Sequence, residues 1–455
     1  MHTLWRAGLV LALVAPVGAR AEPGADIQAL QKEIDAMRAE YEARLKALEE
    51  RLRAAEAAAA APAPAAPSPP PAPVAASGGG AANAFNPSIS LILSGIYSRT
   101  TQDPADYAIT GVALPSSVAV GPGTRGLSLS ESELGLAASV DPWLRGAANI
   151  AIEPDNTVSV EEAYIQTTSL GHGLSLKAGR FFSGIGYLNP QHMHTWDFVD
   201  NPLAYQAFLD TQYGDDGLQL GWIAPIEQYV ELGLELGRGA SFPATGGGRN
   251  GPGMVALTAH TGGDVGDSNS WRTGVSLLDA RAQDQDLAAV NAAGAVVTNA
   301  FTGSTRVWVA DAIWKWAPHG NAVYTNFKVQ GEYLLSRRSG TLVYDLGGLD
   351  RAGDYHANQS GWYLQGIYQF VRGWRVGLRT EQIDPGNPDY GLNAVALPAI
   401  DYRPRKNSLM LDFSPSEFSR VRLQFARDSA RQGFQDNQLF VQYLMSLGAH
   451  GAHSF

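Results

Sequence analysis

The chain has 455 residues, a formal net charge of −11 and no cysteine. A sequence without cysteine excludes a disulfide scaffold, a thiolate metal site and a lipid-modified N-terminal cysteine. The acidic residues are spread along the chain, so the sequence carries no signal for nucleic acid as a partner. This length allows either two or three soluble domains or one large barrel.

Residues 1–21 are predicted to be a secretory signal peptide. Arg6 gives the positively charged start, the stretch 7–14 is apolar, and Ala19-Arg20-Ala21 is a cleavage site of the A-x-A type, so the mature chain would begin near Glu22. The apolar stretch is too short for a membrane anchor, and no later stretch reaches the roughly 18 apolar residues of a transmembrane helix. An exported chain of this kind that lies in a membrane must therefore be a β-barrel.

Residues 22–56 are predicted to form a coiled-coil helix in the periplasm. The apolar residues recur at intervals of three and four, with one stutter, at Ile27, Leu30, Ile34, Met37, Tyr41, Leu45, Leu48 and Leu52. Such a seam favours self-association as a dimer or trimer, whereas a single solvated helix would be only marginally stable.

Residues 57–86 form a linker rich in alanine, proline and glycine. Seven prolines lie between Pro62 and Pro73, and Gly78-Gly79-Gly80 follow. A segment of this composition is extended and semi-rigid, and it could reach several nanometres into the periplasm. Together with the helix it raises one alternative function, a tether from the outer membrane to the cell wall with peptidoglycan as a partner.

From 87 to 455 apolar and polar residues alternate with a period of two, most clearly in 229–237, 306–316, 327–336 and 362–370. Aromatic residues at both ends of an apolar stripe match the interfacial girdles of a membrane barrel. The alternation predicts that one set of charged side chains faces the lumen: Glu231, Glu235, Asp311, Lys315, Lys328, Glu332, Arg375, Arg379 and Arg422.

Short turns and mostly longer polar loops alternate along the same region. Seven turns, at 141–143, 171–173, 225–227, 262–269, 318–322, 371–373 and 414–417, separate eight loops, at 100–126, 154–158, 183–215, 239–253, 281–304, 337–357, 384–402 and 429–435. A soluble β-sandwich could share this alternation, but it has little reason to keep the apolar face so regular. We therefore predict an all-β fold over 87–455, a 16-stranded antiparallel transmembrane β-barrel.

The inserted loop at 183–215 is the feature around which the barrel region is organised. Loops of this length are functional or disordered, and its many aromatic and aliphatic residues favour an ordered loop folded into the lumen. No Lys or Arg occurs between Phe181 and Gly221. An acidic loop opposite a basic wall predicts a pore constriction with a weak preference for cations, formed by His192, His194, Asp197, Asp200, Asp210, Arg375, Arg379 and Arg422.

The two histidines of the loop also suggest a metal-binding site. Imidazole and carboxylate suit Zn²⁺, and His192 and His194 lie beside Asp197 and Asp200 in the sequence. Residues two apart point to opposite sides of an extended chain, so joint ligation needs a turn there. The alternative is that both are polar loop residues hydrogen-bonded at the pore wall. Neutral at pH 7, they would become protonated near about pH 5.5 and reduce the cation preference.

The insertion carries a resemblance to a known family. Gly179-Arg180-Phe181, the loop, and then the stretch Phe198-Val199-Asp200-Asn201-Pro202-Leu203 are similar to the phosphate-selective porin O and P family. The resemblance implies sixteen strands, a homotrimer and passive diffusion through a pore narrowed by the third outer loop. Phosphate selectivity needs basic residues at the narrowing, and their absence from the loop argues against phosphate as the solute.

A fainter resemblance links the chain to zinc-regulated outer-membrane receptors. Those receptors imply 22 strands and an N-terminal plug domain, for which this chain has too little length, so energy-coupled import is excluded and zinc as a solute stays open. The terminal Phe455 resembles the assembly signal that the barrel assembly machinery recognises in outer-membrane proteins.

The sequence thus predicts an outer-membrane porin for small hydrophilic solutes or ions, embedded in outer-membrane lipid and without a cofactor. A metal channel and a cell-wall tether are the alternatives. An enzyme is not expected, because the sequence has no nucleophile elbow and no Ser, His and acid placed to suggest a triad.

Overall fold

The computed structural model describes Lys46 and residues 87–118, 120–245 and 250–448. Apart from Lys46, the predicted signal peptide, coiled coil and linker lie outside the described residues, and so does Phe455.

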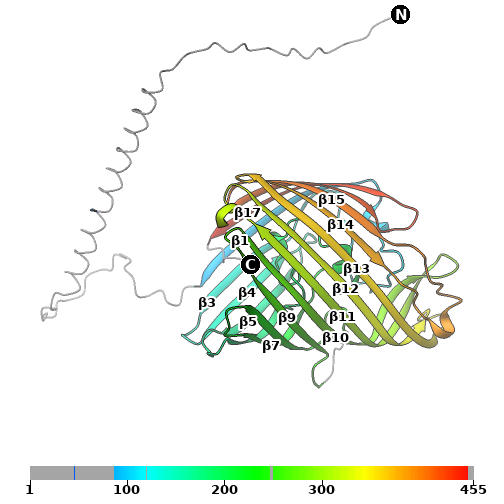
Figure 1. Ribbon diagram of the computed structural model, residues 1–455. Helices are drawn as coiled ribbons and strands as arrows, with labels where there is room; N and C mark the ends of the chain where they lie inside the picture. The colour runs from blue at the N-terminus through cyan, green and yellow to red at the C-terminus, as the bar shows by residue number, and fades with distance from the viewer. Residues whose placement is uncertain (1–45, 47–86, 119, 246–249, 449–455) are drawn as a thin grey trace, which may run out of the picture. The chain divides into compact units, whose positions relative to one another are not determined.

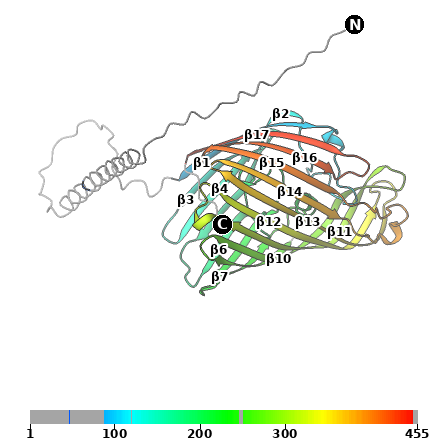
Figure 2. The same ribbon diagram turned by 45° about the horizontal axis from the view of Figure 1, so that its top comes forward.

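The described chain forms one closed antiparallel barrel (Figures 1 and 2). From β3 onward each strand pairs with the next, and β1 pairs with β17 from Ser90–Gly448 to Thr100–Gln438, which closes the wall. The strands β2 and β3 pair with successive parts of β1, so they share one position in the wall, and the prediction of sixteen strands is confirmed. The strands are β1 Ser88–Thr100, β2 Gly126–Leu129, β3 Ser132–Ser139, β4 Leu144–Ile152, β5 Val158–Thr167, β6 Leu174–Phe182, β7 Gly214–Ile223, β8 Tyr229–Gly237, β9 Met254–Val265, β10 Asn269–Val290, β11 Val296–Trp316, β12 Asn326–Tyr344, β13 Arg351–Val371, β14 Trp374–Asp384, β15 Arg405–Ser416, β16 Ser419–Ser429 and β17 Asp436–Gly448.

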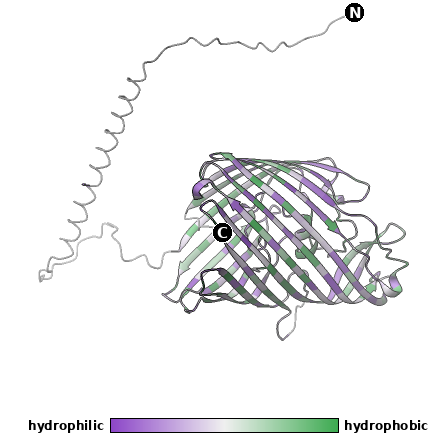
Figure 3. Cartoon of the chain, viewed as in Figure 1, coloured by the Kyte–Doolittle hydropathy of each residue, from purple (hydrophilic) through white to green (hydrophobic). Residues whose placement is uncertain are grey.

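Hydrophobic and hydrophilic residues alternate along the strands (Figure 3). This alternation separates an outer apolar face from an inner polar face. In β15, Lys406 and Asp412 are fully buried, whereas Leu409 and Leu411 are exposed on the opposite face. Five of the charged residues assigned to the lumen from the sequence are buried in this way: Glu235, Asp311, Glu332, Arg379 and Arg422. The inner face is therefore densely charged, and the outer face suits lipid.

A charge placed on the outer face tests this assignment. Leu411→Arg should lower the free energy of unfolding by about 2–4 kcal/mol, because an arginine near the middle of the apolar band must lose its hydration. Thr380 lies on the same face of β14 nearer the long-loop end, where Thr380→Arg should cost about 0–1 kcal/mol. Denaturant unfolding from lipid vesicles measures both values, and equal losses would contradict the assigned depth of Leu411.

Two predicted loops are instead strands. Residues 281–304 and 337–357 lie mostly within β10 to β13, which are 19 to 22 residues long. The hairpins continue beyond the neighbouring strands because Leu287, Phe301, Leu342 and Tyr355 form a second small core with Leu397, which comes from the loop 385–404. Polar residues on the outer face of these extensions made them look like loops in the sequence.

The helical segments of the barrel region are short: η1 Pro104–Asp106, η2 Met193–Thr195, α2 Leu203–Leu209, η3 Pro318–Gly320 and η4 Gly391–Asn393. Among the described residues, no helix has both the length and the apolar character needed to cross a membrane. The segments η2 and α2 belong to the insertion between β6 and β7.

Candidate functional site

The insertion between β6 and β7 lies inside the barrel, as the sequence predicted. Every residue of α2 is buried, and the helix packs on β12, β13 and β14. Leu203 and Phe208 share one apolar core with Val309, Leu334 and Ile383 of the wall. Because its sequence has aromatic and aliphatic residues and no basic ones, this segment can bury most of its surface against the inner wall.

Glu332 of β12 fixes two parts of the insertion, the stretch around Leu188 and the helix α2. Its carboxylate accepts hydrogen bonds from the Leu188 amide at 2.9 Å, the Tyr205 hydroxyl at 2.8 Å and the Tyr363 hydroxyl at 2.7 Å. The loop approaches this carboxylate so closely that position 186 must be glycine. Gly186 has a φ of +65°, and a Cβ there would lie 2.4 Å from Glu332 Oε2.

The stretch between these two parts is fixed to the basic wall by two loop aspartates. Asp197 pairs with Lys328 of β12 and, at 3.2 Å, with Arg375 of β14. Asp200 pairs with Arg379 of β14 at 2.8 Å, and it also pairs with Lys406 of β15. These contacts bring loop and wall charges together directly rather than across an open gap.

Burial raises the pKa of both loop aspartates, but the neighbouring cations outweigh this effect. The charges of Lys328 and Arg375 hold the pKa of Asp197 well below its usual range. The charges of Lys406 and Arg379 do the same to the pKa of Asp200. Both carboxylates are therefore ionised at neutral pH and hold the loop by charge-assisted hydrogen bonds.

Arg422 and Asp210, which the sequence also predicted at the pore constriction, have different roles from each other. Arg422 of β16 donates to the Trp196 carbonyl oxygen at 2.9 Å and pairs with Asp412 at 2.7 Å, so it belongs to the same attachment. Asp210 ends α2 in a left-handed conformation, and it makes none of the ion pairs found in the described part of the chain. Burial raises the pKa of Asp210 to about 6.

The two loop histidines lie on the opposite side of the lumen, against glutamates of β3 and β5. His192 Nδ1 is 3.3 Å from both Glu133 Oε2 and Glu161 Oε2, and His192 Nε2 is 3.0 Å from Glu162 Oε2. His194 Nδ1 is 3.1 Å from the same Glu133 oxygen. The turn of η2 stacks the two imidazole rings with their centroids 5.7 Å apart, which supplies the turn that joint ligation requires.

Glu161 and Glu162 are consecutive, yet both carboxylates reach His192. The pairing of β4 with β5 shifts between Asn149–Glu162 and Ile150–Val160, which leaves Glu161 as an extra residue in β5. A bulge of this kind breaks the alternation and turns two successive side chains toward one face. Strict alternation would have separated the two residues, so the sequence pattern did not indicate this acidic cluster.

The surroundings of His192 set its charge. Burial lowers the pKa of the imidazole, but hydrogen bonds to Glu133, Glu161 and Glu162 outweigh burial and raise this pKa well above its ordinary value. These hydrogen bonds favour the protonated form of His192. This direction runs against the expectation of a neutral His192 that becomes protonated near about pH 5.5.

The first outer loop, 101–125, also lies against the insertion, a contact that the sequence did not indicate. The Gly121 amide donates to Gln206 Oε1 of α2 at 3.1 Å, and Ile109 joins the apolar core around α2. The Tyr107 hydroxyl donates to Asp428 of β16 at 3.0 Å. The insertion is thus held between the inner wall and a second loop.

Protein-family models give no match to the chain. The fold is similar to a loop-deletion variant of OmpT, an outer membrane protein of Vibrio cholerae, with a TM-score of 0.50, 10% identity and coverage of 80% of this chain and 99% of that one. The outer membrane channel DcaP of Acinetobacter baumannii gives a TM-score of 0.46 at 12% identity, over 79% of this chain and 97% of that one.

The fold is therefore similar to that of an outer-membrane β-barrel. In sequence, the chain is 30% identical to an uncharacterized protein of Aquifex aeolicus (strain VF5) over 398 residues, which cover 82% of this chain and 80% of that protein. The chain belongs to the same family as this Aquifex aeolicus protein.

Proposed function

We propose that the protein is an outer-membrane porin through which small hydrophilic solutes diffuse passively. The observation that carries this proposal is the ordered insertion inside the barrel, paired through Asp197 and Asp200 with the basic wall. The resemblance to the phosphate-selective porin O and P family adds a homotrimer with its N-terminal helix in the periplasm. A loop attached at so many points narrows the lumen permanently and selects solutes by size.

Fixed charges in this channel would give a weak preference for cations. The loop aspartates are compensated by Arg375, Arg379, Lys328 and Lys406, so they contribute little net field. On the other side, the three glutamates around His192 outnumber its single positive charge. The acidic cluster, rather than the loop aspartates, is then the source of the cation preference.

Planar-bilayer recordings with a KCl gradient test this proposal. The wild-type channel should conduct with a reversal potential that favours K⁺, and a double Glu161→Gln/Glu162→Gln variant should shift it toward Cl⁻. Glu227→Gln, in the short turn between β7 and β8, is the matched control and should leave it unchanged. A wild-type protein that does not conduct would rule out the porin, whereas an unmoved reversal potential would rule out only the acidic cluster.

The preference for cations should also increase with pH. His192 is charged at any pH below its pKa, which is raised above the ordinary value of about 6.5. As the pH rises through this raised pKa, His192 loses the proton whose charge offsets the glutamates. Charged and polar groups near this site include Glu133, Glu161, Glu162, Lys177, Asn149 and His194. The reversal potential should move toward that of K⁺ in wild type and His172→Gln, and stay flat in His192→Gln. The same slope in all three proteins would assign the titration to another group.

Zinc binding or passage is a second candidate, favoured by one observation. Three residues, Glu133, Glu161 and His192, each place one possible ligand atom in the same small region. These three atoms lie within 4.8 Å of one another, which is close enough to share a metal ion. The donor set of imidazole and carboxylates suits Zn²⁺. Zinc would have to displace the proton of His192, so its binding should release a proton.

Isothermal titration with Zn²⁺ in two buffers of different ionisation enthalpy tests the zinc site. Wild-type protein should give saturable heats that depend on the buffer, because a proton is released. A double variant, His192→Ala/His194→Ala, should lose them, whereas the turn variant His172→Ala/His319→Ala should keep them. Equal heats in both double variants would end the hypothesis.

A further inference from the structure

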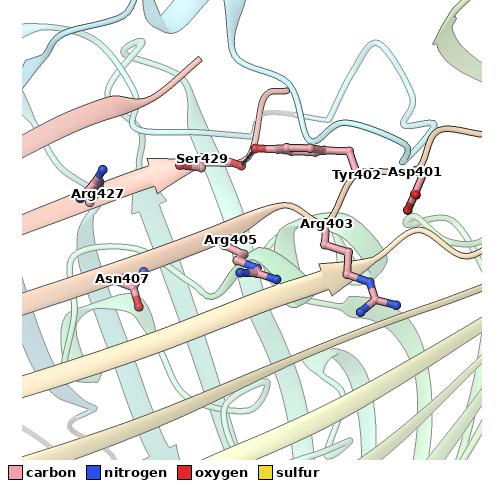
Figure 4. A pocket seen from close by; sticks show the side chains of 7 residues that line it. All are labelled: Asp401, Tyr402, Arg403, Arg405, Asn407, Arg427 and Ser429. Atoms are coloured by element: carbon pink, nitrogen blue, oxygen red, sulfur yellow. Dashed lines mark hydrogen bonds between the residues drawn. The ribbon is translucent and has the colours of Figure 1, made fainter. Parts of the chain in front are cut away.

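The outer face of the barrel carries a basic cavity at the long-loop ends of β15 and β16 (Figure 4). The cavity has a volume of about 560 Å³ and is lined by Asp401, Tyr402, Arg403, Arg405, Asn407, Arg427 and Ser429. Arg405, Asn407 and Arg427 are exposed, and Lys406, between the first two, is buried in the lumen. The cavity therefore faces away from the pore.

A second hollow of about 490 Å³ adjoins this cavity on the same face. It is mainly apolar, it shares Asn407 and Arg427 with the basic cavity, and its apolar lining includes Leu364, Gly366, Leu378, Leu409 and Phe425. Along β15 and β16 the outward residues thus change from Leu409 and Phe425 to Asn407, Arg405 and Arg427 toward the long-loop end. A change of this kind marks the level at which lipid tails give way to headgroups.

The cations of the cavity are only partly compensated. Arg403 pairs with Asp384 at 3.1 Å, and the Arg427 guanidinium donates to Gln435 Oε1 at 2.5 Å. Across the described ranges, neither Arg405 nor Arg427 forms an ion pair, and the only carboxylate in the lining is that of Asp401. Arg405 and Arg427 also lie on adjacent strands. Arg405 pairs with Ser429, which is two residues along β16 from Arg427, so the two arginines are diagonal neighbours. Two such guanidinium groups can hold one phosphate between them.

We propose that this face binds a phosphorylated lipid of the outer leaflet, with its phosphate between Arg405 and Arg427 and an acyl chain in the adjoining apolar hollow. The long loops place the cavity on the outer side of the membrane. The apolar hollow argues for a lipid rather than free phosphate, because free phosphate would leave that hollow exposed. This site lies outside the lumen and is independent of what the channel transports.

The full-length protein in detergent, analysed by native mass spectrometry with diphosphorylated lipid A as the probe, tests the site. Wild-type protein should retain the lipid, and dephosphorylated lipid A should bind at least about tenfold more weakly, since charge-assisted hydrogen bonds to phosphate are lost. Arg405→Gln/Arg427→Gln should show the same loss. Arg337→Gln, an outward arginine on β12, is the matched control and should bind normally.

The apolar hollow is tested separately by filling it. A Cβ on Gly366 would meet only Phe327 ring atoms at 3.7 and 3.8 Å, so Gly366→Leu fits the strand and should weaken lipid A binding without any change of charge. Equal binding of both lipids, or an equal loss in Arg337→Gln, would overturn the proposal. Displacement of the lipid by millimolar inorganic phosphate, with no effect of Gly366→Leu, would reduce the site to an anion site and also overturn it.

Discussion

Replacing Asp200 with alanine is expected to release the stretch of the insertion around Asp200 and to increase single-channel conductance. The substitution leaves Arg379 and Lys406 without their loop carboxylate, and both side chains are buried in the lumen. Removing one partner of a buried ion pair costs about 3–5 kcal/mol. Arg379 keeps Glu381 at 3.0 Å and Lys406 keeps Asp428 at 3.5 Å, so the loss should lie at the lower end of this range, about 3 kcal/mol. The loop can avoid this cost by leaving the wall, which lets water reach both cations and widens the channel.

Unfolding in denaturant and planar-bilayer conductance measure the two effects of Asp200→Ala. Asp216→Ala is the matched control. Asp216 pairs with Arg180 at 2.7 Å on the outer surface, where the two side chains are 39% and 46% exposed, and surface pairs contribute about 0–1 kcal/mol. The control should leave the conductance unchanged. If Asp200→Ala also keeps the wild-type conductance, the pairs of Asp200 do not hold the loop in the pore.

Glu332→Leu should have a comparably large effect on the stretch around Leu188 and on α2. Leucine cannot accept the hydrogen bonds from the Leu188 amide, the Tyr205 hydroxyl and the Tyr363 hydroxyl. Each buried donor left without a partner costs about 1–3 kcal/mol, so the free energy of unfolding should fall by at least about 3 kcal/mol. The loop should then separate from β12, and the conductance should rise.

Two milder variants separate the causes of this loss. Glu332→Gln keeps one acceptor oxygen and nearly the same volume, so it should lose less stability than Glu332→Leu. Tyr363→Phe removes one donor and should cost about 1–1.5 kcal/mol. If Glu332→Leu is no less stable than Glu332→Gln, the hydrogen bonds to this carboxylate do not anchor the loop.

The sequence by itself determined the barrel and the inner and outer faces of its wall. A strand places successive side chains on opposite faces, so the alternation around Lys328 and Glu332 is enough to assign them to the lumen. The short turns, several of which contain proline or glycine, could likewise be identified from the local sequence, and they mark the end of the barrel with short connections. The composition of 183–215 was also sufficient to predict an ordered loop in the lumen, because apolar residues without basic ones must be buried somewhere.

Only the tertiary structure decided which charges meet. Asp200 and Lys406 are separated by 206 positions, and Asp197 and Lys328 by 131, so no local pattern links them. Lys406 could have been assigned to the lumen from its alternation with outward Leu409 and Leu411, but its partner depends on how the loop crosses the barrel. The cluster of Glu161 and Glu162 around His192 needed a bulge, whose position depends on pairing with β4. Alternation is a property of one strand and can be read locally, whereas ion pairing, pKa values and bulges depend on segments that only folding brings together.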